Sequence, residues 1–242
     1  MFRLVDVHCH AYELSGDLNR YKDIIIVGVS DDLESSMQTI RLSNDFENLI
    51  PAIGLHPWSV KSNSVKEAKR IVQLLDKYDV RMLGEVGLDR RFVPKTFNEQ
   101  LEVFKIFLEA SREYGLALNI HSVDAWRQVL DLVMKYNVEV VVFHWYTGPL
   151  DVLEDIIAQK YYISINPAVK IQEKHKLIVK ETPLDYILTE SDAPYNYRGI
   201  RLSPDMVNNV IHVISHLKGV DTKTVRETIW RNFERLKGTI GM

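Results

Sequence analysis

Hydrophobic and polar positions divide this chain into two kinds of segment. Eight short runs rich in Val, Ile and Leu have the length and composition of strands buried on both faces. They cover residues 3–7, 24–29, 49–53, 82–86, 117–120, 139–143, 161–165 and 186–188. Longer amphipathic stretches with helical spacing cover residues 33–42, 65–78, 98–114, 125–136, 150–159, 169–180, 204–217 and 222–236. The alternation predicts strands that are each followed by a helix.

Eight strand–helix units favour an α/β fold, a single (β/α)8 barrel spanning residues 1–242, because such barrels usually have about 250 residues. A doubly wound open sheet is the alternative, although no glycine-rich phosphate loop follows the first predicted strand. Only residues 9–22 separate the first two strands, so this connection is expected to be shortened and irregular. Extra helices are predicted after the last strand.

Composition narrows the possible function classes. The chain is 46% hydrophobic and 26% charged, as globular domains are, and its net charge of −3 is atypical of nonspecific nucleic-acid binders. Any contact with nucleic acid must therefore be local. No apolar run is long enough to span a membrane, and nothing indicates an obligate protein partner. A single cysteine, Cys9, and an N-terminus without a signal-peptide pattern predict a cytoplasmic protein.

Polar residues concentrate at the carboxyl ends of the predicted strands. In a (β/α)8 barrel these ends converge on one face, where active sites are built. Five of the eight histidines lie there, with one carboxylate inside an apolar run and another after the last strand. These side chains are His8, His10, His56, His121, His144, Glu85 and Asp192. They form a candidate site for metal ions.

Individual residues in this set also have simpler interpretations. His8 and His10 point the same way from a strand, whereas Cys9 points oppositely and is expected to be packed. A metal ion would remove the large cost of burying Glu85 unpaired in its apolar run. The remaining members could instead be hydrogen-bonded core histidines (His121, His144), a turn residue (His56) or a helix cap (Asp192). His175, between two lysines, is expected on a solvated helix face.

The motifs together resemble those of the TatD-related metal-dependent hydrolases, in the amidohydrolase-like superfamily. The matching segments are Asp-Val-His-Cys-His at 6–10, Ile-Gly-Leu-His-Pro at 53–57, Gly-Glu-Val-Gly-Leu-Asp at 84–89, Ile-His-Ser at 120–122, Phe-His-Trp-Tyr-Thr-Gly at 143–148, Thr-Glu-Ser-Asp-Ala-Pro-Tyr at 189–195 and Asn-Phe-Glu-Arg-Leu at 232–236. Each motif is modest alone, but their order and spacing are specific. The resemblance covers nearly the whole chain and implies a TIM barrel.

The resemblance also implies a function and a ligand set. The family's activity is metal-dependent DNA hydrolysis, often exonucleolytic, by water activated at two divalent ions. The implied ligands are His8, His10 and Asp192 for one ion, His121 and His144 for the other, and Glu85 bridging both. Asp192 is also the candidate proton acceptor, so Asp192 and Glu85 are the implied catalytic residues. Histidine and carboxylate ligands suit Zn, Mn, Co, Ni or Mg.

The substrate is predicted less sharply than the chemistry. The family's sixth-strand motif commonly reads His-Cys-Phe, whereas this chain has His144-Trp145-Tyr146, which reshapes the pocket. DNA or another phosphate ester is the expected substrate, and the candidate contacts are His56, Arg90, Trp145, Tyr195 and Arg198. The alternatives are a lactonase, amidase or phosphotriesterase on the same barrel, or a nonenzymatic barrel protein. The complete ligand set argues against the latter.

Overall fold

Eight parallel strands, hydrogen-bonded to one another in chain order, form the centre of the protein in a computed structural model that describes residues 2–14 and 16–242. They are β1 (Leu4–Cys9), β2 (Ile24–Gly28), β3 (Leu49–Ile53), β4 (Met82–Asp89), β5 (Ala117–Val123), β6 (Val141–Phe143), β7 (Tyr162–Ile165) and β8 (Ile187–Thr189). The Thr189 hydroxyl donates to the Val5 carbonyl, and the Asp192 N–H donates to the His8 carbonyl. The last strand therefore lies beside the first, and the predicted barrel is confirmed.

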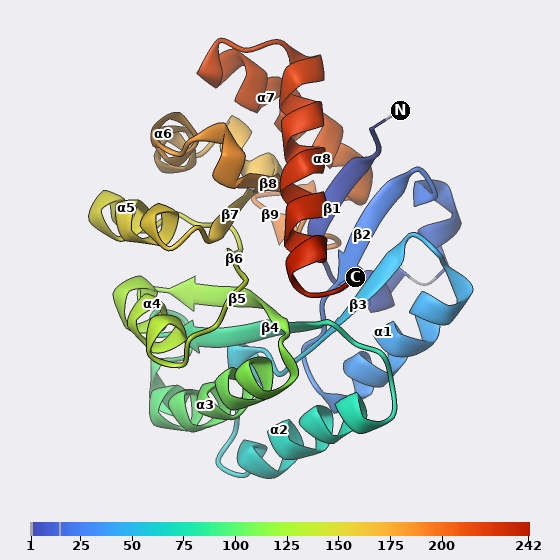
Figure 1. The fold of residues 1–242 in the computed structure, drawn as a ribbon, viewed down its shortest axis with the longest axis vertical. Helices are drawn as coiled ribbons and strands as arrows, with labels where there is room; N and C mark the ends of the chain where they lie inside the picture. The colour runs from blue at the N-terminus through green and yellow to red at the C-terminus, as the bar shows by residue number, and fades with distance from the viewer. Residues whose placement is uncertain (1, 15) are drawn as a thin grey trace.

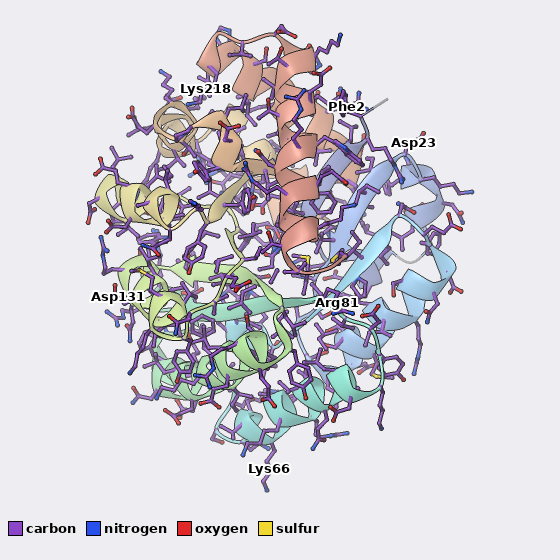
Figure 2. All side chains as sticks on the ribbon, in the orientation of Figure 1. Phe2, Asp23, Lys66, Arg81, Asp131 and Lys218 are labelled. Carbon is purple, nitrogen blue, oxygen red and sulfur yellow. The ribbon has the colours of Figure 1, made fainter. Side chains whose placement is uncertain are left out.

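Helices surround the strands in chain order, as Figure 1 shows. They are α1 (Leu33–Asp45), α2 (Ser64–Val72), α3 (Phe97–Tyr114), α4 (Trp126–Lys135), α5 (Leu150–Ala158), α6 (Glu173–Glu181), α7 (Val207–Lys218) and α8 (Thr222–Thr239). Two short 3-10 turns, Ala11–Leu14 and Leu18–Tyr21, connect β1 to β2, so the shortened first connection is confirmed. Charged side chains on the helices, such as Lys66 and Asp131, point away from the strands in Figure 2.

Two strands extend three residues beyond their predicted ends. β4 continues past Val86 to Asp89, and β5 continues past Ile120 to Val123. All eight residues of β4 are buried, including Glu85 and Asp89. The hydrophobic pattern did not predict the full length of β4, because the strand contains carboxylates that are buried against histidine side chains.

Glycines allow the strands that carry polar residues to approach one another closely. Gly87 in β4 has a φ of 146°, and a Cβ atom there would lie 2.0 Å from the His121 carbonyl oxygen. A Cβ atom on Gly54, just after β3, would lie 2.6 Å from the Glu85 carbonyl oxygen. No side chain fits at either distance, so both glycines are required for β3, β4 and β5 to converge around Glu85.

The chain after β8 contains a feature that the sequence pattern missed. β9 (Asn196–Tyr197) and β10 (Ile200–Arg201) pair as a small antiparallel ribbon before α7. Its strands are too short and too exposed to produce a hydrophobic alternation. Among the described residues, no helix is both long and apolar enough to cross a membrane.

The expectation for His175 was wrong. Its side chain lies on the inner face of α6 and is 0% exposed, although Lys174 and Lys176 flank it. Neither ring nitrogen has a hydrogen-bond partner in the part of the chain that the structure describes. Burial therefore lowers the pKa of His175 from 6.5 to about 3.

This buried histidine should make stability depend on pH. Between pH 6.5 and 3 only the unfolded chain binds the proton of His175, so the free energy of unfolding falls as the pH drops through that range. An unfolded-state pKa of about 6.5 predicts a loss of about 2 kcal/mol between pH 7 and pH 5 from this residue. When the free energy of unfolding is measured by urea denaturation at pH 7 and at pH 5, it should fall less in His175→Leu than in the wild type, by about this amount. If the free energy of unfolding falls equally in the two proteins, the pH dependence does not come from His175.

Candidate metal centre

The carboxyl ends of the strands bring six of the seven predicted site residues to the wall of one cavity of about 760 Å³, and His8 is buried against Glu85 beside it. His8 lies in β1 and His10 directly after it, and Glu85 and His121 lie in β4 and β5. The other three side chains follow β3 (His56), β6 (His144) and β8 (Asp192). Cys9, which alternates with the first two histidines, is buried in a separate apolar cluster, as predicted.

Glu85 lies at the centre of this cluster. Its side chain is almost completely buried, and histidine nitrogens face both of its carboxylate oxygens. Facing Oε2 are His8 Nε2 at 3.2 Å and His10 Nε2 at 3.5 Å; facing Oε1 are His56 Nε2 at 3.2 Å, His121 Nδ1 at 2.7 Å and His144 Nε2 at 2.9 Å. The two oxygens thus divide the histidines into two groups.

Asp192 stands beside the group at Oε2. Its Oδ1 lies 3.5 Å from both His8 Nε2 and His10 Nε2, and ligand-type atoms of these three residues lie within 4.8 Å of one another. A second such set comprises His8, Glu85 and His144. Donor atoms this close together can coordinate a metal ion after small adjustments, because Zn–N and Zn–O bonds are about 2.0–2.2 Å long.

In four of the histidines, the ring nitrogen that points away from Glu85 faces an oxygen atom of another side chain. The pairs are His8 Nδ1 and Asn119 Oδ1 at 2.7 Å, His10 Nδ1 and Asp31 Oδ1 at 3.2 Å, His121 Nε2 and Asp89 Oδ2 at 3.1 Å, and His144 Nδ1 and Glu190 Oε1 at 3.7 Å. Where the acceptor is within hydrogen-bond distance, as beside His8 and His121, it favours the tautomer with its N–H outward and its lone pair directed inward. His8 Nε2 is buried without a hydrogen-bond partner among the described residues. The donor set therefore fits a metal centre.

His56 has the opposite arrangement. Its Nδ1 accepts the backbone N–H of Trp58 at 3.0 Å, so in the neutral ring the proton lies on Nε2. That Nε2–H points toward Glu85 Oε1. His56 is therefore suited to donate a hydrogen bond in the cavity, whereas the other four rings are suited to bind metal.

The charges in the cluster perturb several pKa values. Burial alone would lower the pKa values of His10 and His144, but nearby carboxylates, Asp31 and Glu85 respectively, raise both well above the usual value. Burial alone would raise the pKa of Glu85, but the histidines, His56 foremost, hold it well below its usual value. Without metal, ionised carboxylates thus stabilise protonated imidazoles, and metal binding must release protons from this cluster.

The outer partners of the histidines are not among the predicted site residues. Asp89 is the last residue of β4 and Glu190 directly follows β8, and both lie within the quoted motifs. Asn119 lies inside β5, and Asp31 lies in the connection between β2 and α1. Asn119 Nδ2 donates to the Val7 carbonyl, which turns Oδ1 toward His8. Asp89 accepts hydrogen bonds from both His121 and Trp58, which lower its pKa to about 2 against the effect of burial. Only their positions in sequence hinted at these roles.

Most of the predicted substrate contacts line the cavity. His56, Trp145, Tyr195 and Arg198 do so. Arg90 does not: its guanidinium donates to Gln128 and lies 4.5 Å from the centre of the Phe97 ring. The neighbouring Arg91 lines the cavity instead, because its backbone N–H is fixed by Asp89 Oδ1 at the end of β4.

Comparisons with known proteins show the family to which the chain belongs. The family model described as TatD related DNase matches residues 5–238. An uncharacterized metal-dependent hydrolase of Methanocaldococcus jannaschii, MJ1582, is 28% identical over 95% of each chain. The putative deoxyribonuclease TATDN3 of Mus musculus is 27% identical over 96% of this chain and 87% of its own. The crystal structure of YjjV, a TatD homologue from Escherichia coli, superposes with a TM-score of 0.84 at 20% identity, covering 97% of this chain and 98% of that one, which shows the shared fold.

Proposed function

Because the chain belongs to the TatD-related DNase family of metal-dependent hydrolases, we propose that it is a deoxyribonuclease that hydrolyses phosphodiester bonds at two divalent metal ions. The putative deoxyribonuclease function named for TATDN3 supports this substrate, and the exonucleolytic mode comes from the family resemblance. The positively charged Arg91 and Arg198 on the cavity wall suit a substrate with several phosphates.

The division of histidines between the two oxygens of Glu85 is the observation that carries the two-ion proposal. His8, His10 and Asp192 would hold one ion with Glu85 Oε2. His121 and His144 would hold the other with Glu85 Oε1. Glu85 would then bridge the ions, as carboxylates do in two-metal hydrolases. Imidazole-rich ligands suit Zn, Mn, Co or Ni, and the carboxylates also permit Mg.

The chain's own side chains would perform the remaining steps. Bound divalent ions supply Lewis-acid stabilisation of the phosphoryl oxygens and lower the pKa of water. Asp192, on the cavity wall, would accept the proton from the attacking water. The Nε2–H of His56 would donate a hydrogen bond to a phosphoryl oxygen as negative charge develops there.

The proposal is tested with end-labelled single-stranded DNA. The protein is stripped of metal, reloaded with Mg, Mn or Zn, and assayed alongside metal-free protein. Metal-dependent shortening of the labelled strand is the expected result, and a ladder of single-nucleotide steps would support exonucleolytic digestion. If protein with two bound ions per chain leaves DNA intact but hydrolyses a lactone, an amide or a phosphotriester, the deoxyribonuclease proposal is wrong.

A further inference from the structure

Two aromatic groups stand on different parts of the cavity wall. The first, which we call the Trp58 platform, comprises Trp58 after β3 and Phe92 after β4, with Arg91 beside them. The second, the Trp145 platform, comprises Trp145 after β6, Tyr197 in β9, and Arg198. In a ring of strands ordered β1 to β8, β7 lies opposite β3, and the Trp145 platform follows β6 and β8, the two neighbours of β7. The cluster around Glu85 therefore lies between the two platforms.

The first platform exposes its rings to an unusual degree. Trp58 is 48% exposed and Phe92 is 60% exposed, and their ring centres lie 5.7 Å apart in an edge-to-face arrangement. Trp58 is nevertheless fixed, because its Nε1–H donates to Asp89 Oδ2 at 2.6 Å. The same oxygen faces His121 Nε2. A rigid indole face is thus presented to the cavity beside a proposed metal ligand.

The second platform is also held by hydrogen bonds. Trp145 Nε1–H donates to Gln172 Oε1 at 3.1 Å, and the Gln172 amide donates to the Tyr197 hydroxyl at 2.6 Å. The two rings lie 5.1 Å apart, and Tyr195, with its ring 6.1 Å from Trp145, extends the surface. Fixing the rings before a ligand arrives reduces the entropy lost on binding.

Each platform combines an aromatic face with a guanidinium group. The Arg91 guanidinium lies 5.6 Å from the centre of the Phe92 ring, and that of Arg198 lies 5.4 Å from the centre of the Tyr197 ring. Aromatic faces stack on nucleobases of any sequence, and arginines bind the phosphates that flank them. A lactone or a simple amide would use neither the second aromatic face nor two separate cations.

We propose that each platform stacks one nucleobase, so that the preferred substrate carries unpaired bases on both sides of the reacting phosphate. This inference rests on the proposed phosphodiester hydrolysis. It makes a dinucleoside unit the smallest good substrate, and it excludes a base that remains paired in a duplex, because stacking on a cavity wall requires the base to leave the helix.

Abasic substrates test the two positions separately. Short single-stranded oligonucleotides would carry one abasic residue, either 5′ or 3′ of the bond at which the unmodified strand is first cut. For the wild type, kcat/KM should fall roughly tenfold to a hundredfold with either substitution. Trp58→Ala should remove the sensitivity to an abasic residue on one side only, and Trp145→Ala should remove it on the other.

Two further variants separate the loss of an aromatic face from a general effect on folding or on the orientation of the proposed metal ligands. Trp58→Phe loses the hydrogen bond to Asp89 but keeps an aromatic face, so it should retain sensitivity to the abasic residue even if its absolute rate falls. Tyr78→Ala removes an exposed ring outside the cavity and should behave as the wild type. Wild-type cleavage that is equally fast on abasic and unmodified strands would overturn this inference alone. If the metal-loaded wild type leaves the unmodified strand uncut, both this inference and the proposed function fail.

Discussion

Glu85→Gln is expected to lose bound metal and to hydrolyse its substrate at least about a thousandfold more slowly, a loss of roughly 4 kcal/mol of transition-state stabilisation. The glutamine side chain preserves the shape of the carboxylate but removes its charge. Its amide NH2 would face the nitrogens of one histidine group, which cannot accept a hydrogen bond and bind a metal ion at the same time. Both proposed ion positions should therefore be weakened by this one change.

The measurement combines metal content per chain after dialysis with the rate of DNA hydrolysis. His56→Gln is the matched control, because His56 also faces Glu85 Oε1 but directs an N–H toward it. We expect this variant to keep the metal content of the wild type and to hydrolyse DNA more slowly. Full metal content with full turnover in Glu85→Gln would remove Glu85 from the site, and metal loss in His56→Gln would make His56 a ligand.

Asp192→Asn is expected to lower kcat by roughly 10² to 10⁴, the usual range for a lost general base. Asparagine keeps an oxygen that can stay near His8 and His10 but does not accept a proton at neutral pH. The Asp192 backbone N–H donates to the His8 carbonyl, so the exchange should leave the loop in place. The fall in kcat should therefore exceed any fall in metal content.

A control for Asp192 lies on the same connection between β8 and α7. Asp205 is an exposed carboxylate whose Oδ1 accepts the Ser203 hydroxyl, and Asp205→Asn should leave kcat unchanged. Steady-state kinetics on DNA, with metal content measured in parallel, compares the two variants. If Asp192→Asn retains the wild-type kcat, another group accepts the proton.

The barrel could be predicted from the sequence because its cause is local. Parallel strands covered on both faces must be apolar along their length, and β3 occupies the predicted residues 49–53 without change. The candidate site could be located for a related reason. Histidines and carboxylates at the ends of such runs converge wherever the strands form a barrel. The structure brings six of these seven side chains to the wall of one cavity and buries the seventh, His8, against Glu85. Their roles as ligands remain predictions for the metal measurements above.

The partners of these side chains depended on the tertiary structure. His8 and Asn119 are 111 residues apart, and their contact exists only because β1 and β5 face each other inside the barrel. The direction of each imidazole proton, and with it the difference between His56 and the other four rings, follows from such contacts. The lysines beside His175 suggested an exposed helix face, and only the packing of α6 against the barrel placed the ring inside. Periodicity in a sequence reports which segments are buried, whereas the atoms that meet there are determined by how distant segments pack.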